Sequence, residues 1–538
     1  MQWRIILLAL VVVGASTIPY VVGWAAQTKA HVFGGFIIDL DDSNSYLAVM
    51  QQGMRGDWRF VSLYSPEPQR GIWMYTFYIL LGHVVRLTAL PPLLVYHSAR
   101  AVCGILLLVT IHEFARLCLH RRRLAWNALL LASVSSGLGW LREIILPSVP
   151  GGVSPPDLWF LDGYTFLAIF TFPHYALAWT LLLAAFGSAL SYRRTPKPQC
   201  LLLGGGAAFL ATALHPTLPV VIGTVVATYG MLLWIADGQF PVRWAVAGAP
   251  LVLGGGSMAG YLWSAFNNDP VLESWGHAVM ATPAFHHMLW GYGLLIPLAA
   301  VGGLDMVRRR NCHGVFLTVW ATAALLLGYV PFNMQRRFLE GIHIPISLLA
   351  AIGLRRSVLS LAQSRLVQTV AGLGYPRRRA VWLTQSVVIA LTAVTNLYLL
   401  CSAIVTVGSR FPEFFHSRAE VNTFEWIDNH LTDKDIVLAS YGTGNIIPAW
   451  TAQRVFVGHW AESAQCPERK RLVAAFFSDT TSDRHRVALL GRYGISHVYF
   501  GEREKSLGGF DPSSVSYLRE VCTFGEATVY EANWGEDP

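Results

Sequence analysis

The sequence has one dense group of acidic residues, directly after its first long apolar run. Asp39, Asp41 and Asp42 stand within four consecutive positions and are followed by 43–46, Ser-Asn-Ser-Tyr. Carboxylates held this close raise a pKa within the group or need a counter-cation, which suits a general base or a divalent-metal site. The alternative is that Asp42 or Ser43 caps a helix that starts near Tyr46. A cap accounts for one acid well and for three poorly.

A second chemical signal is the pair Arg336 and Arg337, in the polar segment 333–343 between two late apolar runs. Guanidinium groups bind phosphate oxygens with two parallel hydrogen bonds, so this pair is predicted to hold a lipid-linked phosphate. The alternative is that both side chains extend along the membrane surface toward lipid headgroups. We favour phosphate binding, because the arginines of other loops already define the topology.

Further polar residues lie at the ends of apolar runs or in the segments predicted to share the face of the acidic group, and they are candidates for a supporting or substrate-contacting role. These candidates are Tyr46, Glu67, Asp162, His174, His215 and Gln335. If the chemistry needs a divalent cation (Mg or Mn), Asp41 and Asp42 are its predicted ligands. No other cofactor is predicted.

The composition is that of a membrane protein. Of the 538 residues, 54% are hydrophobic and only 13% charged, against about 25% charged in soluble domains. This excludes a disordered chain and a single soluble globule. Eleven apolar runs are candidate membrane spans: 4–26, 93–119, 124–141, 165–190, 200–216, 218–236, 244–265, 288–304, 313–330, 341–354 and 380–406. The glycine triplets 204–206 and 254–256 are expected to allow close helix packing.

The net charge of +8 follows membrane topology and does not indicate a nucleic-acid partner. Lysine and arginine gather in short clusters between apolar runs, at 121–123, 193–197, 308–310 and 355–379. Because such clusters stay in the cytoplasm, the N-terminus is predicted inside and the loop 27–92 outside. The aromatic-rich segment 72–90 is interpreted as an interfacial or re-entrant helix, since a twelfth span would reverse every later loop.

The tail 410–538 differs from the rest of the chain. Helix-like and strand-like patterns alternate along it, as in 419–431, 435–440, 468–477 and 497–500. This alternation predicts a small α/β domain with a largely parallel sheet, on the outer side. The predicted organisation is a mainly α, polytopic transmembrane bundle over 1–409 followed by an extracytoplasmic α/β domain over 410–538.

The order of these features resembles the GT-C superfamily. A first span is followed by an outer loop that opens with Asp41, Asp42 and Tyr46, then by juxtamembrane apolar helices and many spans. GT-C proteins are polytopic membrane glycosyltransferases that use polyprenyl-phosphate-linked sugars. They include oligosaccharyltransferases, but 410–538 holds no WWDYG-like motif, which disfavours transfer to asparagine.

The resemblance implies a specific reaction. Asp41 or Asp42 would be the base that activates an acceptor hydroxyl, and one direct displacement would invert the anomeric centre. Arg336 and Arg337 would bind the donor phosphate, which is an inference from charge placement. The partners would be a polyprenyl-phosphate-linked sugar donor and a lipid, glycan or protein acceptor. The expected location is the plasma (cytoplasmic) membrane.

Two other classes of function remain open on the sequence. A transporter or flippase of lipid-linked sugars would need ionisable residues within its spans, for which His112 and Glu113 are the candidates. A non-catalytic membrane subunit would tolerate Asn at positions 41 and 42. A polymerase or ligase is less well matched, because its large loop usually comes late in the chain.

Overall fold

The computed structural model describes residues 2–146, 154–361 and 377–533. They form two compact units. Unit 1 comprises Met1–Ile18, His97–Gly260 and Val279–Ile404, and unit 2 comprises Pro19–Tyr96, Tyr261–Ala278 and Val405–Pro538. The boundary at residues 409 and 410 stays a prediction.

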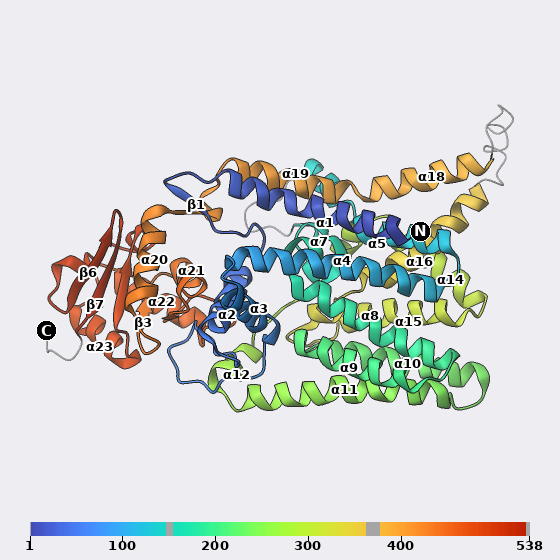
Figure 1. Cartoon of the computed structure of the whole chain (residues 1–538), viewed down its shortest axis with the longest axis horizontal. Helices are drawn as coiled ribbons and strands as arrows, with labels where there is room; N and C mark the ends of the chain where they lie inside the picture. The colour runs from blue at the N-terminus through green and yellow to red at the C-terminus, as the bar shows by residue number, and fades with distance from the viewer. Residues whose placement is uncertain (1, 147–153, 362–376, 534–538) are drawn as a thin grey trace. The chain divides into compact units, whose positions relative to one another are not determined.

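Unit 1 is helical throughout its described part (Figure 1). Three of its helices, α1 (Gln2–Ala25), α4 (Pro92–Leu119) and α19 (Val394–Gly408), continue into unit 2, as does α11 (Val242–Asn267). The remaining elements are α5 (Arg122–Val134), α6 (Gly139–Ile145), η1 (Pro156–Leu158), η2 (Leu161–Gly163), α7 (Thr165–Thr171), α8 (Pro173–Arg194), α9 (Pro198–Leu214), α10 (Leu218–Asp237), α13 (Phe285–Tyr292), α14 (Leu295–Arg308), α15 (Cys312–Leu327), η3 (Gln335–Leu339), α16 (His343–Leu361) and α18 (Arg377–Thr392).

The predicted multi-pass character is confirmed. By length and composition, seven helices of the described chain can cross a membrane, or up to nine if two bent pairs, α13 with α14 and α18 with α19, each form one span. Two further expected spans correspond to the shorter apolar helices α9 and α15. The segment 72–90 contains α3 (Thr76–Thr88), which is also short. Eleven spans therefore stay a prediction.

The packing of unit 1 follows from small residues and from one central helix. The most apolar stretch at α16 is 94% buried, against 33% for α10 and α11, so α16 lies at the centre. A Cβ atom added at Gly254 would stand 2.3 Å from the carbonyl oxygen of Gly205. The close packing expected at both glycine triplets is therefore confirmed between α9 and α11.

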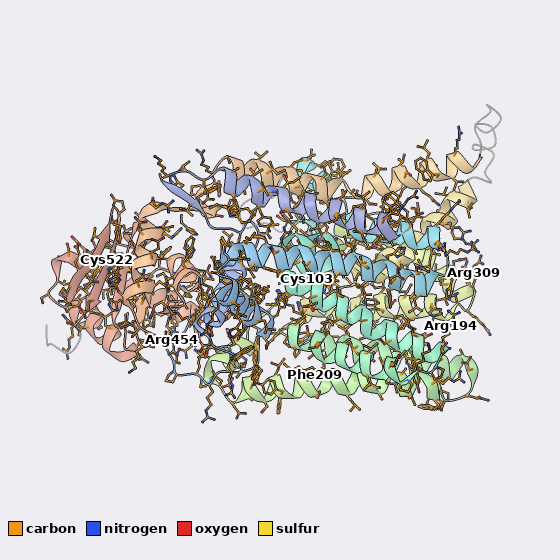
Figure 2. The ribbon with its side chains drawn as sticks, viewed as in Figure 1. Cys103, Arg194, Phe209, Arg309, Arg454 and Cys522 are labelled. Atoms are coloured by element: carbon orange, nitrogen blue, oxygen red, sulfur yellow. The ribbon has the colours of Figure 1, made fainter. Side chains whose placement is uncertain are left out.

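Positive residues of separate loops gather at one end of unit 1. Figure 2 shows Arg194, which ends α8, and Arg309, which follows α14, at the same end of the helices. The sequence assigned both to cytoplasmic loops, and their common position agrees with that alternation. The cluster at 355–379 lies partly outside the described residues.

Unit 2 combines the first predicted outer loop with the tail. The loop supplies α2 (Leu40–Arg55), α3 and β1 (His31–Phe33), and α12 (Pro270–Gly276) comes from the segment before Val279. Strand β1 pairs antiparallel with β2 (Phe415–Ser417) of the tail. Directly after β2, Ser417 and Glu420 form a capping box that starts α20 (Arg418–His430).

The tail forms a five-stranded sheet in the order β4-β3-β5-β7-β6 (Figure 1). Its strands are β3 (Ile436–Leu438), β4 (Arg454–Val455), β5 (His497–Phe500), β6 (Leu518–Phe524) and β7 (Ala527–Ala532), and its helices are α20, α21 (Tyr441–Thr451), α22 (Cys466–Phe477), α23 (Asp483–Tyr493) and α24 (Glu502–Lys505), with the short turns η4 (Pro412–Phe414) and η5 (Pro512–Ser514). β3 pairs parallel with β4 and β5, whereas β7 pairs antiparallel with β5 and β6. The sheet is thus mixed rather than largely parallel, because Gly525 (φ 55°) permits a tight hairpin between β6 and β7.

Candidate functional site

The acidic group lies at the start of α2 in unit 2. The helix begins at Leu40, so Asp41 and Asp42 belong to its first turn and do not cap a helix that starts near Tyr46. The N-cap position is Asp39, in the left-handed region at φ 53°, and its side chain makes no capping hydrogen bond. The capping interpretation is therefore wrong. The first turn favours carboxylates, since the helix dipole leaves partial positive charge there.

Each of the two half-buried carboxylates accepts a hydrogen bond from the tail. The Tyr441 hydroxyl donates to Asp41 Oδ2 at 2.6 Å, and His459 Nε2 lies 3.0 Å from Asp42 Oδ1. Tyr441 begins α21, and the Asn445 amide one turn later donates to the backbone oxygen of Asp41 at 3.2 Å. The acids thus stand in a fixed polar environment assembled from both ends of the sequence.

The imidazole of His459 is buried and held on both nitrogens. Its Nδ1 accepts from the backbone N–H groups of Ala461 at 3.3 Å and Glu462 at 3.1 Å. Burial acts to lower the pKa of His459, but the hydrogen bond to Asp42 and the charge of Glu462 outweigh it and raise this pKa above its ordinary value. The buried Glu462 carboxylate accepts from Ser45 of α2, and burial raises the pKa of Glu462.

Tyr441 and His459 were not among the predicted site residues, although one signal in the sequence pointed to them. Tyr441 follows β3 and His459 follows β4, and these two strands are parallel neighbours. Polar residues at the carboxyl ends of adjacent parallel strands tend to form sites. The segment 442–445 lies inside α21, the helix that Tyr441 begins.

Two other predicted residues of unit 2 lie in the surroundings of the acids. Tyr46 is buried on α2, and its ring stacks on Tyr78 of α3 with centroids 4.5 Å apart. Glu67 forms an ion pair with Arg469 of α22, and it accepts from the Ser65 hydroxyl at 2.8 Å. Both link the loop 27–92 to neighbouring elements, and their roles as pocket residues stay predictions.

Unit 1 brings Asp162, Arg336 and Arg337 together. Asp162 of η2 is only 1% exposed, and its Oδ1 lies 2.9 Å from Arg337 Nη1 on η3. The Tyr175 hydroxyl also donates to this oxygen at 3.1 Å. Burial would raise the pKa of Asp162, but the guanidinium groups of Arg337 and Arg336 outweigh it and hold this pKa below its ordinary value.

The two arginines differ in how they are held. Arg337 contacts Asp162 and lies 3.5 Å from Glu340 Oε1. Arg336 Nε lies 3.2 Å from Asp162 Oδ2, and among the described residues this buried Nε has no hydrogen-bond partner. The guanidinium of Arg336 instead lies 5.5 Å from the ring centroid of Trp159. Arg337 is thus fixed by carboxylates, and Arg336 much less so.

The remaining predicted residues of unit 1 divide into two groups. His215 Nδ1 lies 2.8 Å from Glu340 Oε1, and the His215 ring stacks on His174 with centroids 5.0 Å apart. Both histidines therefore belong to the cluster around Arg337. Gln335 does not belong to it: its amide lies beside the backbone of Val330 and Thr282 and bonds both once its oxygen and nitrogen are exchanged.

The residues offer no ready-made metal site. Among the residues that the structure describes, no three His, Cys, Asp or Glu side chains are grouped to hold a metal ion. Asp41 and Asp42 each use an oxygen to accept a hydrogen bond from Tyr441 or His459. Mg²⁺ is commonly held by one or two carboxylates, with water and phosphate oxygens completing its shell, so the metal role of Asp41 and Asp42 stays a prediction.

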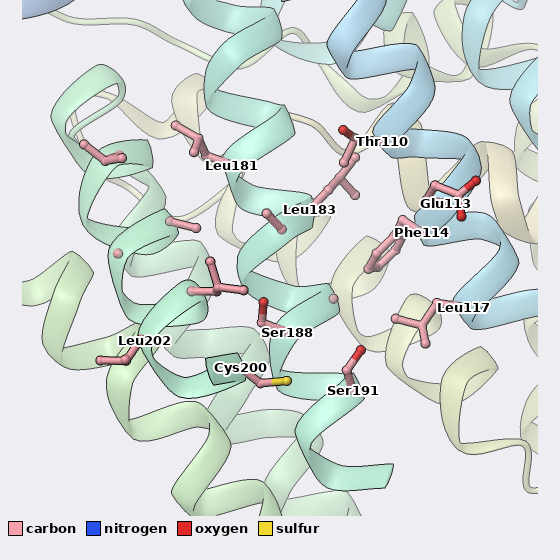
Figure 3. Close-up of a pocket in the computed structure, with 16 residues that line it drawn as sticks. Thr110, Glu113, Phe114, Leu117, Leu181, Leu183, Ser188, Ser191, Cys200 and Leu202 are labelled. Atoms are coloured by element: carbon pink, nitrogen blue, oxygen red, sulfur yellow. The ribbon is translucent and has the colours of Figure 1, made fainter. Parts of the chain in front are cut away.

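A separate groove of about 730 Å³ lies between α4, α8 and α9 in unit 1 (Figure 3). Leu181, Leu183 and Leu202 contribute to its largely apolar wall, and Glu113, Ser188 and Ser191 are polar exceptions. None of the predicted site residues lines it. Glu113 pairs with Arg116 at 3.6 Å and with His112 at 3.0 Å on its own helix.

The fold is shared with solved membrane glycosyltransferases, although no protein-family model and no curated protein matches the sequence. The apo oligosaccharyltransferase of Archaeoglobus fulgidus aligns with a TM-score of 0.54 at 12% identity, over 97% of this chain and 73% of that one. ArnT of Cupriavidus metallidurans, bound to undecaprenyl phosphate, aligns with a TM-score of 0.53 at 14% identity, over 97% of both chains.

The mycobacterial arabinofuranosyltransferase AftD aligns with a TM-score of 0.50 at 14% identity, over 97% of this chain and 40% of that one. At such low identities the likeness concerns the fold. The resemblance predicted from the acidic loop and the many spans is confirmed at that level, and this multi-pass membrane chain has the fold of the GT-C superfamily.

Proposed function

We propose that this protein is a glycosyltransferase that moves a sugar from a polyprenyl-phosphate donor to an acceptor hydroxyl. The observation that carries the proposal is the pair Asp41 and Asp42, oriented by hydrogen bonds in the first turn of α2, within a GT-C fold. The donor class is supported by ArnT, which binds undecaprenyl phosphate in its solved structure. A non-catalytic subunit has no need to orient two carboxylates in this way.

The proposed reaction is a single displacement at the anomeric carbon. Asp42 takes the proton of the acceptor hydroxyl as the new carbon–oxygen bond forms. The bond between the anomeric carbon and the phosphate oxygen breaks, and its electron pair leaves with the phosphate. Because the phosphate leaves as a stable anion, no general acid is required, and the anomeric centre inverts.

We assign the base to Asp42 rather than Asp41 because of their partners. Asp42 accepts from an imidazole that is held on both nitrogens, which keeps this carboxylate in one orientation. Burial, and then the hydrogen bond to Asp41, raise the pKa of Tyr441, which therefore stays a neutral donor. Asp41 is assigned to orienting the acceptor.

Arg336 is proposed to bind the donor phosphate, with Arg337 as the residue that fixes its surroundings. Arg336 lies next to Asp162 with Nε at 3.2 Å, and the outer nitrogens of its guanidinium are proposed to meet phosphate oxygens. Arg337 stays balanced by Asp162 and Glu340. The proposed displacement uses no metal ion. A need for Mg or Mn stays a prediction, which removal of metal by a chelator tests.

The acceptor is proposed to be a lipid, glycan or protein on the outer face of a plasma membrane. The positive clusters 121–123, 193–197 and 308–310 support this orientation, with the N-terminus in the cytoplasm and the tail outside.

The test is transfer by the purified full-length protein in lipid nanodiscs, with a panel of radiolabelled polyprenyl-phosphate sugars. We expect one donor to be consumed, and D42N to lower the transfer rate about 100-fold or more. D41N should lower the rate less, and neither change should lower the unfolding temperature by much, because Asn is nearly isosteric with Asp. Full activity in D42N would remove Asp42 as the base, and loss of transfer in EDTA would show that a metal is required.

A further inference from the structure

The proposed reaction leaves one question open, namely what keeps the carboxylate of Asp42 in a fixed orientation. The nearest group is His459, whose ring stands between Asp42 on one side and its own backbone turn on the other. A lone imidazole on a surface would rotate freely, whereas this one is only 3% exposed.

The tautomer of His459 follows from its hydrogen bonds. Two backbone N–H groups, from Ala461 and Glu462, point at Nδ1, so this nitrogen must present its lone pair. The hydrogen of the neutral ring is therefore on Nε2, where it is donated to Asp42 Oδ1. The turn that supplies these N–H groups is closed by Ser463, whose hydroxyl accepts from the backbone N–H of Gly458 and of His459, both at 3.1 Å.

The titratable groups around His459 come from three segments. Asp42 and Asp41 face it from α2, and Glu462 of its own turn lies 4.0 Å from Nδ1. The ring of Tyr64, from the segment between α2 and α3, lies with its centroid 5.6 Å away. Among the three carboxylates, Asp42 is the one that meets the Nε2 hydrogen.

We propose that His459 is a positioning residue for sugar transfer: the tail of the chain donates the Nε2 hydrogen to Asp42 and holds the carboxylate in its reactive orientation. This inference rests on the proposed function. The α/β tail thereby takes part in the reaction, since the loop after β4 supplies the histidine that contacts Asp42.

The test compares H459A with H459Q in the full-length protein. H459A should lower kcat about 10- to 100-fold and leave the KM for the donor unchanged. H459Q should recover most of this loss, because the glutamine amide can donate from nearly the same place as Nε2. This split between kcat and KM, together with the rescue by glutamine, is a readout that a merely structural role would not give.

The matched control is H497Q, which alters another buried histidine of the tail, 3.8 Å from Asp435. A purely structural role of His459 would lower the amount of active protein without lowering kcat per active molecule, as a destabilising change at His497 would. An unchanged kcat in H459A would overturn the inference while leaving the proposed function in place.

A second measurement separates the two proposals. The unfolding temperatures of D42A, H459A and the double variant should be non-additive, since each single change leaves the partner group without its hydrogen bond. This coupling needs no substrate. If the unaltered protein consumes no donor, the proposed function fails, but the unfolding temperatures still show whether Asp42 and His459 interact. Additive effects of the two changes on the unfolding temperature would reject the positioning role.

Discussion

At the scale of single residues, Arg336 and Arg337 are adjacent in sequence but differ in their expected roles. Arg336 Nε lies 3.2 Å from Asp162, whereas Arg337 contacts both Asp162 and Glu340. We expect R336A to raise the apparent KM for the lipid donor about tenfold, because one charge-assisted contact to phosphate is lost. R336K should restore part of the loss, since it keeps the charge without the planar fork. Initial rates across a donor titration measure this effect.

For Arg337 the expected effect is on stability. Its removal leaves the buried carboxylates of Asp162 and Glu340 without their shared cation, which costs about 3–5 kcal/mol for a broken buried pair. R337A should therefore unfold at a lower temperature than R336A, as thermal unfolding in detergent will report. The control is R309A, whose arginine pairs with Asp305 outside this cluster. A donor KM raised by R337A alone would reverse the two assignments.

The site residues that could be predicted are those that form an unusual pair with their direct neighbour in the sequence. Asp41 and Asp42 were visible because acids rarely stand side by side after an apolar run, and Arg336 and Arg337 because they interrupt a region poor in cations. Their partners were not visible. His459 and Tyr441 lie about 400 positions from the acids that they contact, and nothing in a single sequence reports a pairing at that separation.

At the scale of elements, α2 is held in place by a close approach to α3. A Cβ atom added at Gly53 would lie 2.2 Å from the carbonyl oxygen of Ile79, and one added at Gly82 would lie 2.1 Å from that of Met50. The backbones must separate to admit either, so G53A should cost about 1–3 kcal/mol. Because α2 carries Asp41 and Asp42, transfer should also fall. Thermal unfolding and the transfer assay together test this contact.

The matched control is G223A in α10, where nothing lies within 4 Å of the added Cβ atom. Alanine is the better helix former there, so this variant should be neutral or more stable by about 0.5–1 kcal/mol. Equal losses of stability in G53A and G223A would contradict the proposed contact between α2 and α3. The comparison separates steric crowding from a general intolerance of Gly→Ala changes in helices.

Elements were predictable where periodicity is strong and less so at their boundaries. The segments 419–431, 468–477 and 497–500 correspond closely to α20, α22 and β5. The start of α2 was misplaced to Tyr46, because Asp41 and Asp42 are better known as caps than as first-turn residues. β6 was missed, since Arg519, Glu520 and Thr523 give it the look of a polar connection.

At the scale of the whole molecule, hydropathy and charge predicted the helical membrane architecture, and the likeness to solved GT-C structures confirms that fold. These signals are properties of long segments, which survive without any knowledge of tertiary contacts. The candidate site is less predictable, because it depends on tertiary contacts. It depends on which loop residues meet, and no segment-wide pattern encodes that.

Orientation across the membrane is the last prediction. The positive clusters predict Thr195, after α8, in the cytoplasm and Ser506 of the tail outside, and both residues are exposed. In intact cells a membrane-impermeant maleimide should label S506C but not T195C, and T195C should react only after the cells are opened. Labelling of the unaltered protein, which has seven cysteines, gives the background. The reverse pattern would put the tail in the cytoplasm, away from any acceptor on the outer face. Because Tyr441 and His459 belong to that tail, the acids that they hold would then face the cytoplasm too.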